Sequence, residues 1–154
     1  MSRRSYDQYC AIARALDAVG ERWSLLIVRE LLGGPRRYTD LHADLPGVST
    51  DILAARLKQL EAEGLVERRR LERPANATVY QLTGRGDELR VVIAALGAWG
   101  LGALGEQRPT DAVRGHWVTA APAEAAGATA EAAPTDAAGV TAAGATAAGV
   151  TVGG

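Results

Sequence analysis

The sequence predicts a mainly α-helical domain with one small pair of β-strands, followed by a tail that has no fold of its own. Up to about Leu104, apolar residues recur at the spacings of three and four that helices require. Two short stretches, 65–71 and 78–82, are rich in arginine, β-branched and aromatic residues and predict strands. Beyond Val118 the chain consists almost entirely of Ala, Gly, Thr and Val.

The first helix is expected over residues 7–19, where apolar residues recur at spacings of three and four until Gly20 ends the pattern: Tyr9, Ile12, Leu16 and Val19. Cys10 lies in its first turns. Two interpretations stay open for this residue, a small buried hydrophobic side chain and a reactive thiol.

A second helix is expected over residues 21–32, which are apolar on nearly all sides and end at a Gly-Gly-Pro-Arg-Arg turn. We expect it at the buried centre of the domain, because a helix that is hydrophobic all round cannot face water. Its polar residues Arg22, Arg29 and Glu30 are therefore expected at its margins.

Residues 38–45 have room for a two-turn helix with Thr39 as its cap, and a Pro-Gly pair ends it. A longer helix follows that should end at about Glu63. The Ser49 hydroxyl can cap it, and Gly64 has the residue type that usually terminates a helix.

This longer helix has two different faces. Leu53, Leu57 and Leu60 form an apolar stripe suited to a core. The opposite face carries small and polar side chains rather than a run of Glu and Lys, namely Thr50, Asp51, Ala54, Ala55 and Lys58. Such a face can approach another molecule closely.

A short helix, a tight turn and a longer helix form a helix-turn-helix, whose second helix enters the DNA major groove. Two short strands joined by a basic tip follow directly, and this order predicts a wing. Arginines cluster at the turn before the short helix and on the wing, which favours contact with phosphate. The sequence therefore predicts a winged helix-turn-helix.

The last helix is expected to start at Thr83 and to carry an apolar stripe as far as Leu104. The stripe includes Leu89, Leu96 and Trp99 and exceeds what a domain of about 80 residues needs to cover its core. A second copy of the chain is the expected partner, and packing within one chain is the alternative.

The domains are expected to be residues 1–104, the winged helix-turn-helix with its dimerisation helices, then a linker or remnant at 105–118 with Trp117 as its one anchor. Residues 119–154 are an Ala/Gly/Thr-rich tail with too little apolar bulk to fold, and we expect it to be disordered.

Residues 1–118 hold 17 basic and 15 acidic residues, so their net charge is about +2. DNA binding must therefore rest on local patches.

No motif for catalysis, cofactor binding or phosphate cradling is recognisable, so we expect no enzyme activity and no cofactor. His42 and His116 are isolated in the sequence, which predicts no metal site. The chain has no run of 18 apolar residues and no signal-peptide pattern at its polar start. We expect a cytoplasmic protein that does not enter a membrane.

Three stretches carry a resemblance to a known family: GERWSLLIVRELLGGPRRYTDL (20–41), LPGVSTDILAARLKQLEAEGLVERR (45–69) and VYQLTGRGDEL (79–89). With Cys10 and the helix after it, the chain resembles the HxlR family of bacterial winged-helix transcription regulators over about residues 8–104. The resemblance implies a homodimer on an operator of two related half-sites. It also implies that Cys10 matches a cysteine that senses quinones, aldehydes or oxidants in many members, which makes a small-molecule effector compatible with this chain.

The family subgroup with a similar N-terminus often continues into a domain resembling a sterol-carrier fold, and residues 114–118 resemble its start. The resulting prediction is a sequence-specific regulator of double-stranded DNA. A winged helix used only for protein contact is the alternative, favoured by the near-neutral charge. Target genes, effector, and repression or activation stay open. The expected DNA-binding residues are Ser49, Thr50, Asp51, Ala54, Ala55, Lys58, Arg36, Arg37, Arg68, Arg69, Arg70 and Arg73.

Overall fold

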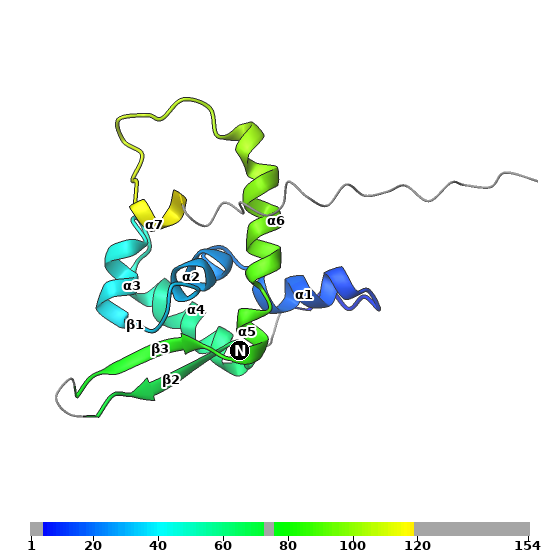
Figure 1. Cartoon of the computed structure of the whole chain (residues 1–154). Coiled ribbons are helices and arrows are strands. Elements are labelled where there is room, and N and C mark those ends of the chain that lie inside the picture. The colour runs from blue at the N-terminus through cyan, green and yellow to red at the C-terminus, as the bar shows by residue number, and fades with distance from the viewer. Residues whose placement is uncertain (1–4, 73–75, 119–154) are drawn as a thin grey trace, which may run out of the picture.

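The structure is a computed structural model that describes residues 5–72 and 76–118. Arg73 and the tail expected to be disordered lie outside these residues. The elements in chain order (Figure 1) are α1 (Ala11–Val19), α2 (Ser24–Leu31), β1 (Arg36–Arg37), α3 (Tyr38–Asp44), α4 (Thr50–Ala62), β2 (Val66–Arg70), β3 (Thr78–Leu82), α5 (Gly84–Asp87), α6 (Arg90–Gly100), the 3₁₀ turn η1 (Leu101–Ala103) and α7 (Gly115–Val118).

The core lies between α2, α3, α4 and the base of the small sheet. The predicted stripe of Leu53, Leu57 and Leu60 is confirmed, because each of these side chains is at most 1% exposed. Ile27 and Leu41, from α2 and α3, are completely buried in the same cluster. The mainly α-helical fold with a small β wing is therefore confirmed.

The ends of α4 follow the predicted capping residues. The Ser49 hydroxyl accepts a hydrogen bond from the Ile52 amide at 3.3 Å. At the other end Gly64 has φ +68°, a left-handed conformation that suits glycine, and the Leu65 amide donates to the Leu60 carbonyl. The two-turn helix α3 also forms, but its N-cap is Arg37 rather than Thr39.

The sheet has one more strand than predicted. Arg36 and Arg37, expected in a turn, form β1 and pair antiparallel with Tyr80 and Val79 of β3. The strand order is β1-β3-β2. Two residues before a helix carry too little pattern to predict a strand, because the pairing depends on a strand some forty residues later.

The single long helix expected from Thr83 to Leu104 is divided into α5, α6 and η1. Thr83 does cap, since its hydroxyl accepts from the Gly86 amide. Gly86 lies so close to the Leu65 carbonyl that a side chain there would collide with it. This close approach anchors α5 against the start of β2, and α6 starts separately at Arg90.

Two N-terminal helices start later than predicted, for different reasons. Trp23 has a positive φ of 80°, which an α-helix does not tolerate, so α2 starts at Ser24. Cys10 has an extended backbone with φ −143° and ψ 130°, so α1 starts at Ala11.

Candidate nucleic-acid interface

The outer face of α4 is open, as the sequence predicts. All six residues assigned to it are exposed: Ser49, Thr50, Asp51, Ala54, Ala55 and Lys58. Ile52, which the sequence analysis did not select, is also 43% exposed beside them. The sequence does indicate this position: Ile52 is apolar, but it lies one residue before Leu53 and so falls off the buried stripe. An exposed isoleucine on such a face suits contact with a thymine methyl group.

Contacts from α3 hold the first turn of α4 in place. The Tyr38 hydroxyl donates to the Thr50 carbonyl at 2.7 Å. The turn between the helices closes through a hydrogen bond from the Val48 amide to the Leu45 carbonyl, with Gly47 at φ +87°. Because Leu45 and Val48 are both buried, this turn is fixed to the core.

The wing arginines differ in how much freedom they have. Arg68 donates to Glu61 of α4 at 2.9 Å, which ties the wing to the recognition helix. Arg70 donates to Asn76 across the hairpin at 3.1 Å. Arg69 is exposed, and the described part of the chain offers it no partner. Arg69 is therefore the wing arginine best placed for a phosphate, while Arg73 lies outside the described residues.

The two arginines of β1 also differ in exposure and in ion pairing. Arg37 is exposed, whereas Arg36 is partly buried with its guanidinium 3.6 Å from Asp44. Opposite Arg36 in the sheet lies Tyr80, whose pKa is raised by burial, against the lowering effect of nearby Arg68. The structure therefore leaves Arg37 available to a ligand and uses Arg36 within the protein.

Two apolar surfaces of the helices that flank this interface are exposed. Tyr9, Ile12 and Leu16, in and just before α1, are exposed, whereas Val19 at the end of the same stripe is buried. On α6 no residue is buried, and Val92, Leu96 and Trp99 form an exposed stripe at helical spacing. Leu89, just before α6, packs on the core instead. Figure 1 shows α6 rising from α5 past α2, with its C-terminal end projecting beyond the helix-turn-helix.

Cys10 is the N-cap residue of α1 and is exposed. The interpretation of this residue as a small buried side chain is therefore wrong. Its thiol is accessible to solvent beside the exposed Tyr9 and Ile12.

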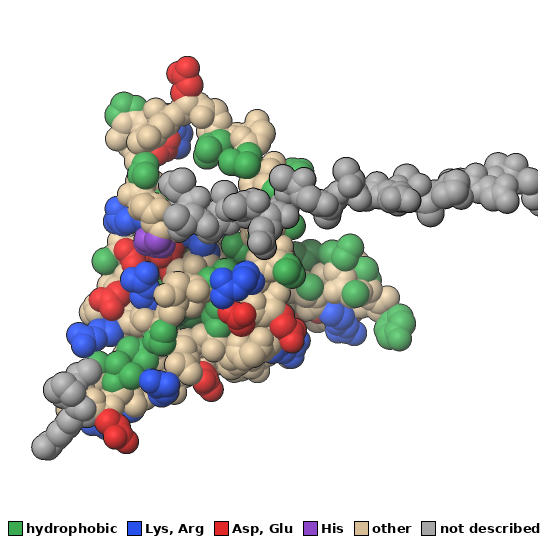
Figure 2. Space-filling model, viewed as in Figure 1, with side chains coloured by type: hydrophobic (Ala, Val, Ile, Leu, Met, Phe, Trp, Pro, Cys, Tyr) green, Lys and Arg blue, Asp and Glu red, His purple; other side chains and the backbone are tan. Residues whose placement is uncertain are grey.

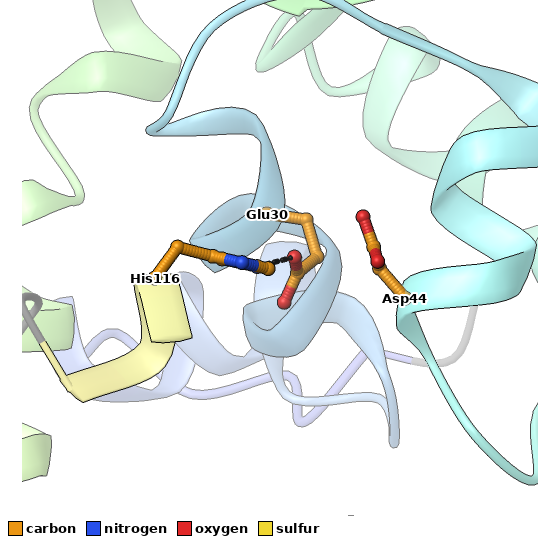
Figure 3. Close-up of side chains that lie close together, drawn as sticks. All are labelled: Glu30, Asp44 and His116. Carbon is orange, nitrogen blue, oxygen red and sulfur yellow. Dashed lines mark hydrogen bonds and ion pairs between the residues drawn. The ribbon is translucent and has the colours of Figure 1, made fainter. Parts of the chain in front are cut away.

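A second cluster, not predicted from the sequence, surrounds Glu30 on α2. This residue was expected at a margin, but its side chain is completely buried. Figure 3 shows that His116 and Asp44 approach it from α7 and α3. Ligand atoms of the three side chains lie within 4.8 Å of one another, so His116 is isolated in sequence but not in space. No sequence signal linked residues separated by more than seventy positions.

Comparison with known proteins agrees with this geometry. The sequence model of the HxlR-like helix-turn-helix family matches residues 18–108. The chain belongs to this family. An HTH-type transcriptional regulator of Synechocystis is 39% identical over 87 residues, which cover 56% of this chain and 64% of the relative. The chain thus spans less than two thirds of that relative. YodB of Bacillus subtilis is 36% identical over 85 residues, covering 55% of this chain and 76% of YodB.

Solved structures of the family have the same fold. The reduced form of YodB superposes with a TM-score of 0.55 at 31% identity, covering 66% of this chain and all of the YodB chain. The redox regulator HypR in its oxidised form gives 0.56 at 25% identity, covering 60% of this chain and 96% of HypR. These likenesses place the chain among the HxlR-like transcription regulators. No helix within residues 5–72 and 76–118 is long and apolar enough to cross a membrane.

Proposed function

We propose that this chain binds double-stranded DNA as a homodimer and regulates transcription from a pseudo-palindromic operator. One observation carries the proposal: the exposed small-residue face of α4 lies on the same unit as the arginines of β1 and β2. Figure 1 shows the wing extending from the end of the domain that contains α4. This is the arrangement by which a helix reads the major groove while a wing contacts the backbone.

Sequence reading is assigned to the first turns of α4. Ala54 and Ala55 let the helix backbone approach the base edges, and Lys58 is placed to meet a phosphate or a guanine. Asp51 could accept from a cytosine amine, or serve only at the positive end of its helix. Thr50 adds a hydroxyl that can pair with several bases.

Affinity for the DNA backbone is assigned to Arg37, Arg69 and Arg70. Arg36 and Arg68 are left out because each forms an ion pair with a carboxylate, whereas Arg70 donates to the neutral side chain of Asn76 and keeps its charge uncompensated there. Arg68 keeps a second role, since its bond to Glu61 sets the angle between wing and recognition helix. With a net charge of −1 for the whole chain, these local charges must supply the attraction.

Dimerisation is assigned to the exposed stripes beside Cys10 and on α6. An isolated domain rarely leaves a row of large apolar side chains in water, and Trp99 alone is 82% exposed. A second copy that covers Leu96 and Trp99 would remove this surface from water and would set the spacing of the two α4 helices.

Control by redox chemistry is assigned to Cys10. The thiol is exposed, and the solved relatives include the redox regulator HypR and a quinone-bound YodB. Addition of the thiolate to a quinone would change the surface beside Tyr9. So would a disulfide between Cys10 and either the Cys10 of a second copy or a small thiol, with diamide as the oxidant that takes up the two electrons and two protons released by the two thiols. We assign the protein no catalytic activity and a cytoplasmic location.

Selection of genomic DNA fragments by the purified full chain tests the proposal. A retained set sharing an inverted repeat is the expected result. The second candidate, a winged helix for protein contact only, is favoured by the near-neutral charge and predicts that no fragment is enriched.

Substitution of Arg69 by Ala checks the assignment of the wing, with Arg14→Ala as matched control. Arg14 is an exposed arginine on α1, which lies on the other side of the domain from the wing (Figure 1). Weaker binding by the Arg69 variant alone supports the assignment. Equal affinities of both variants would remove the wing from the interface.

A further inference from the structure

The segment Arg108–Val118, here called the clasp, returns to the helix-turn-helix and supplies partners to the buried Glu30. A completely buried carboxylate is costly unless it is paired and hydrogen-bonded. Arg29 donates to Glu30 Oε1 from Nε and Nη2 at 2.9 and 2.7 Å. From the clasp, Trp117 Nε1 donates to the same oxygen at 2.7 Å, and His116 Nε2 lies 2.6 Å from Oε2 (Figure 3).

The clasp makes further contacts at the end of α3. Arg114 Nη2 donates to the Ala43 carbonyl at 3.2 Å, and its Nε lies 3.7 Å from Asp44. On the other side of the clasp, the Arg29 guanidinium stacks over the Trp117 ring at 4.3 Å. These contacts join α2, α3 and the clasp at one place.

The clasp also has internal order. Asp111 accepts from the amide of Arg108 at 2.8 Å and from its guanidinium at 2.8 and 3.0 Å. These hydrogen bonds lower the pKa of Asp111 and raise that of Arg108. The resulting turn directs the chain back toward the domain, and the loop from α6 to α7 is visible in Figure 1.

The clasp faces the turn that precedes α4 across an open cavity of about 370 Å³. Leu45 and Pro46 line it on one side, and Asp111 and Trp117 on the other. The family match covers residues 18–108, so the clasp from residue 109 onward lies outside it, while the residues that it contacts lie within it.

We infer that the clasp is an intramolecular regulatory element of the helix-turn-helix, held by the buried carboxylate of Glu30. When it is docked, its Arg114 holds Ala43 and Asp44 at the end of α3, directly before the turn that leads into α4. When it is released, Glu30 loses two of its hydrogen-bond partners and the end of α3 gains freedom, which we expect to extend to this turn. The effect of the clasp on DNA rests on the proposed function, but its docking does not.

The charges around this site favour hydrogen bonds over a bound metal ion. Three side chains, Glu30, Asp44 and His116, could ligate a cation, but the guanidinium groups of Arg29, Arg36 and Arg114 already face the two carboxylates. A divalent ion would add positive charge to a site where these charges are compensated.

A double-mutant cycle in the full chain tests the clasp. Trp117→Phe keeps the ring and removes its N–H, and we expect it to lower the Tm by roughly 5 °C. In a Glu30→Met background the same substitution should change the Tm little, because the acceptor is gone. An equal shift in both backgrounds would overturn the proposal. If the Met variant does not fold, Trp117→Phe is combined with His116→Gln instead. Coupled Tm shifts are expected if both residues dock as one clasp, additive shifts would overturn the proposal, and His42→Gln, as matched control, should add independently.

Three further readouts separate docking from its consequences. The backbone amides of Leu45, Gly47 and Val48 should exchange faster with deuterium in Trp117→Phe than in the wild type, and unchanged exchange would overturn the link to α4. Addition of Zn²⁺ or EDTA should leave the Tm of the wild type unchanged. If Zn²⁺ raised this Tm and His116→Gln abolished the increase, the site would be a metal site rather than a hydrogen-bonded clasp. Loss of DNA binding by every variant and by the wild type would instead contradict the proposed function and leave the clasp standing.

Discussion

The apolar stripes of α4 and α6 have the same helical spacing, but the first is buried and the second is exposed. Leu53, Leu57 and Leu60 on α4 are buried against α2 and the sheet, whereas Leu96 and Trp99 on α6 remain in water. Sequence spacing alone does not distinguish the two. What distinguishes them is position, because α4 lies between other elements and α6 extends from the end of the domain (Figure 1). The α4 stripe forms the core of one chain, and we propose that the α6 stripe forms the interface between two chains.

The outer surfaces show the same contrast. Figure 2 shows basic and acidic side chains mixed over the helix-turn-helix, while hydrophobic side chains gather on the part of the view occupied by α1. Reading DNA and pairing with a second copy are thus assigned to different parts of the molecule.

The largest expected effect comes from the buried stripe. Leu57→Ala should lower the free energy of unfolding by about 2–5 kcal/mol, because it leaves a cavity in a core with no room for water. Urea denaturation measures it, and the loss should be the same at any protein concentration. Leu96→Ala is the matched control, whose cost should appear only where dimers form. A Leu57 variant as stable as the wild type would contradict the described core.

The next effect concerns α6. Leu96→Glu places a charge on the proposed dimer surface and should shift the protein to monomers, since burying an unpaired carboxylate is costly. Sedimentation velocity over a range of concentrations measures this. Arg85→Glu, an exposed change on α5, serves as control. Identical sedimentation of both variants and the wild type would leave the α6 stripe without a partner.

A smaller effect is expected at the wing. Arg69→Ala should weaken operator binding about equally for all sequences and reduce the slope of log K against log salt by about 1, because one phosphate contact is lost. Titrations at several salt concentrations measure the slope. An altered preference between operators with an unchanged slope would mean that Arg69 reads bases.

The smallest effect in the resting protein is expected at Cys10. Cys10→Ser should leave operator affinity unchanged without an oxidant and abolish its response to diamide or quinones. Gel-shift titrations with and without these reagents measure both. A persistent response in the Ser variant would move sensing away from this residue.

Much of the fold was predictable because its signals are local. Ser49, Gly64 and Thr83 cap helices through contacts a few residues away, so their types are sufficient. The strand at Arg36 was missed because its partner Tyr80 is distant in sequence. The division of the last helix was also missed, since it depends on the approach of Gly86 to the Leu65 carbonyl.

The candidate site, like the fold, was predictable where its signals are local and not where they depend on residues distant in sequence. The open face of α4 followed from residue type and periodicity. The division of the arginines into engaged and available ones did not, because Arg36 and Arg68 are held by Asp44 and Glu61 from other elements. Glu30 was placed at a margin because a carboxylate in an apolar helix is usually exposed, and its partners Trp117 and His116 come from the far end of the domain.

The mass of the protein bound to its selected operator tests the central claim most directly. Analytical ultracentrifugation of the complex should give two chains of 16.0 kDa on each duplex. On a half-site duplex, Leu96→Glu should bind as a single chain. Two chains per full operator for the wild type, and loss of tight binding to it by Leu96→Glu, are the results that the account predicts. The account would be contradicted if the wild type bound as one chain per operator and if Leu96→Glu bound the same operator with equal affinity.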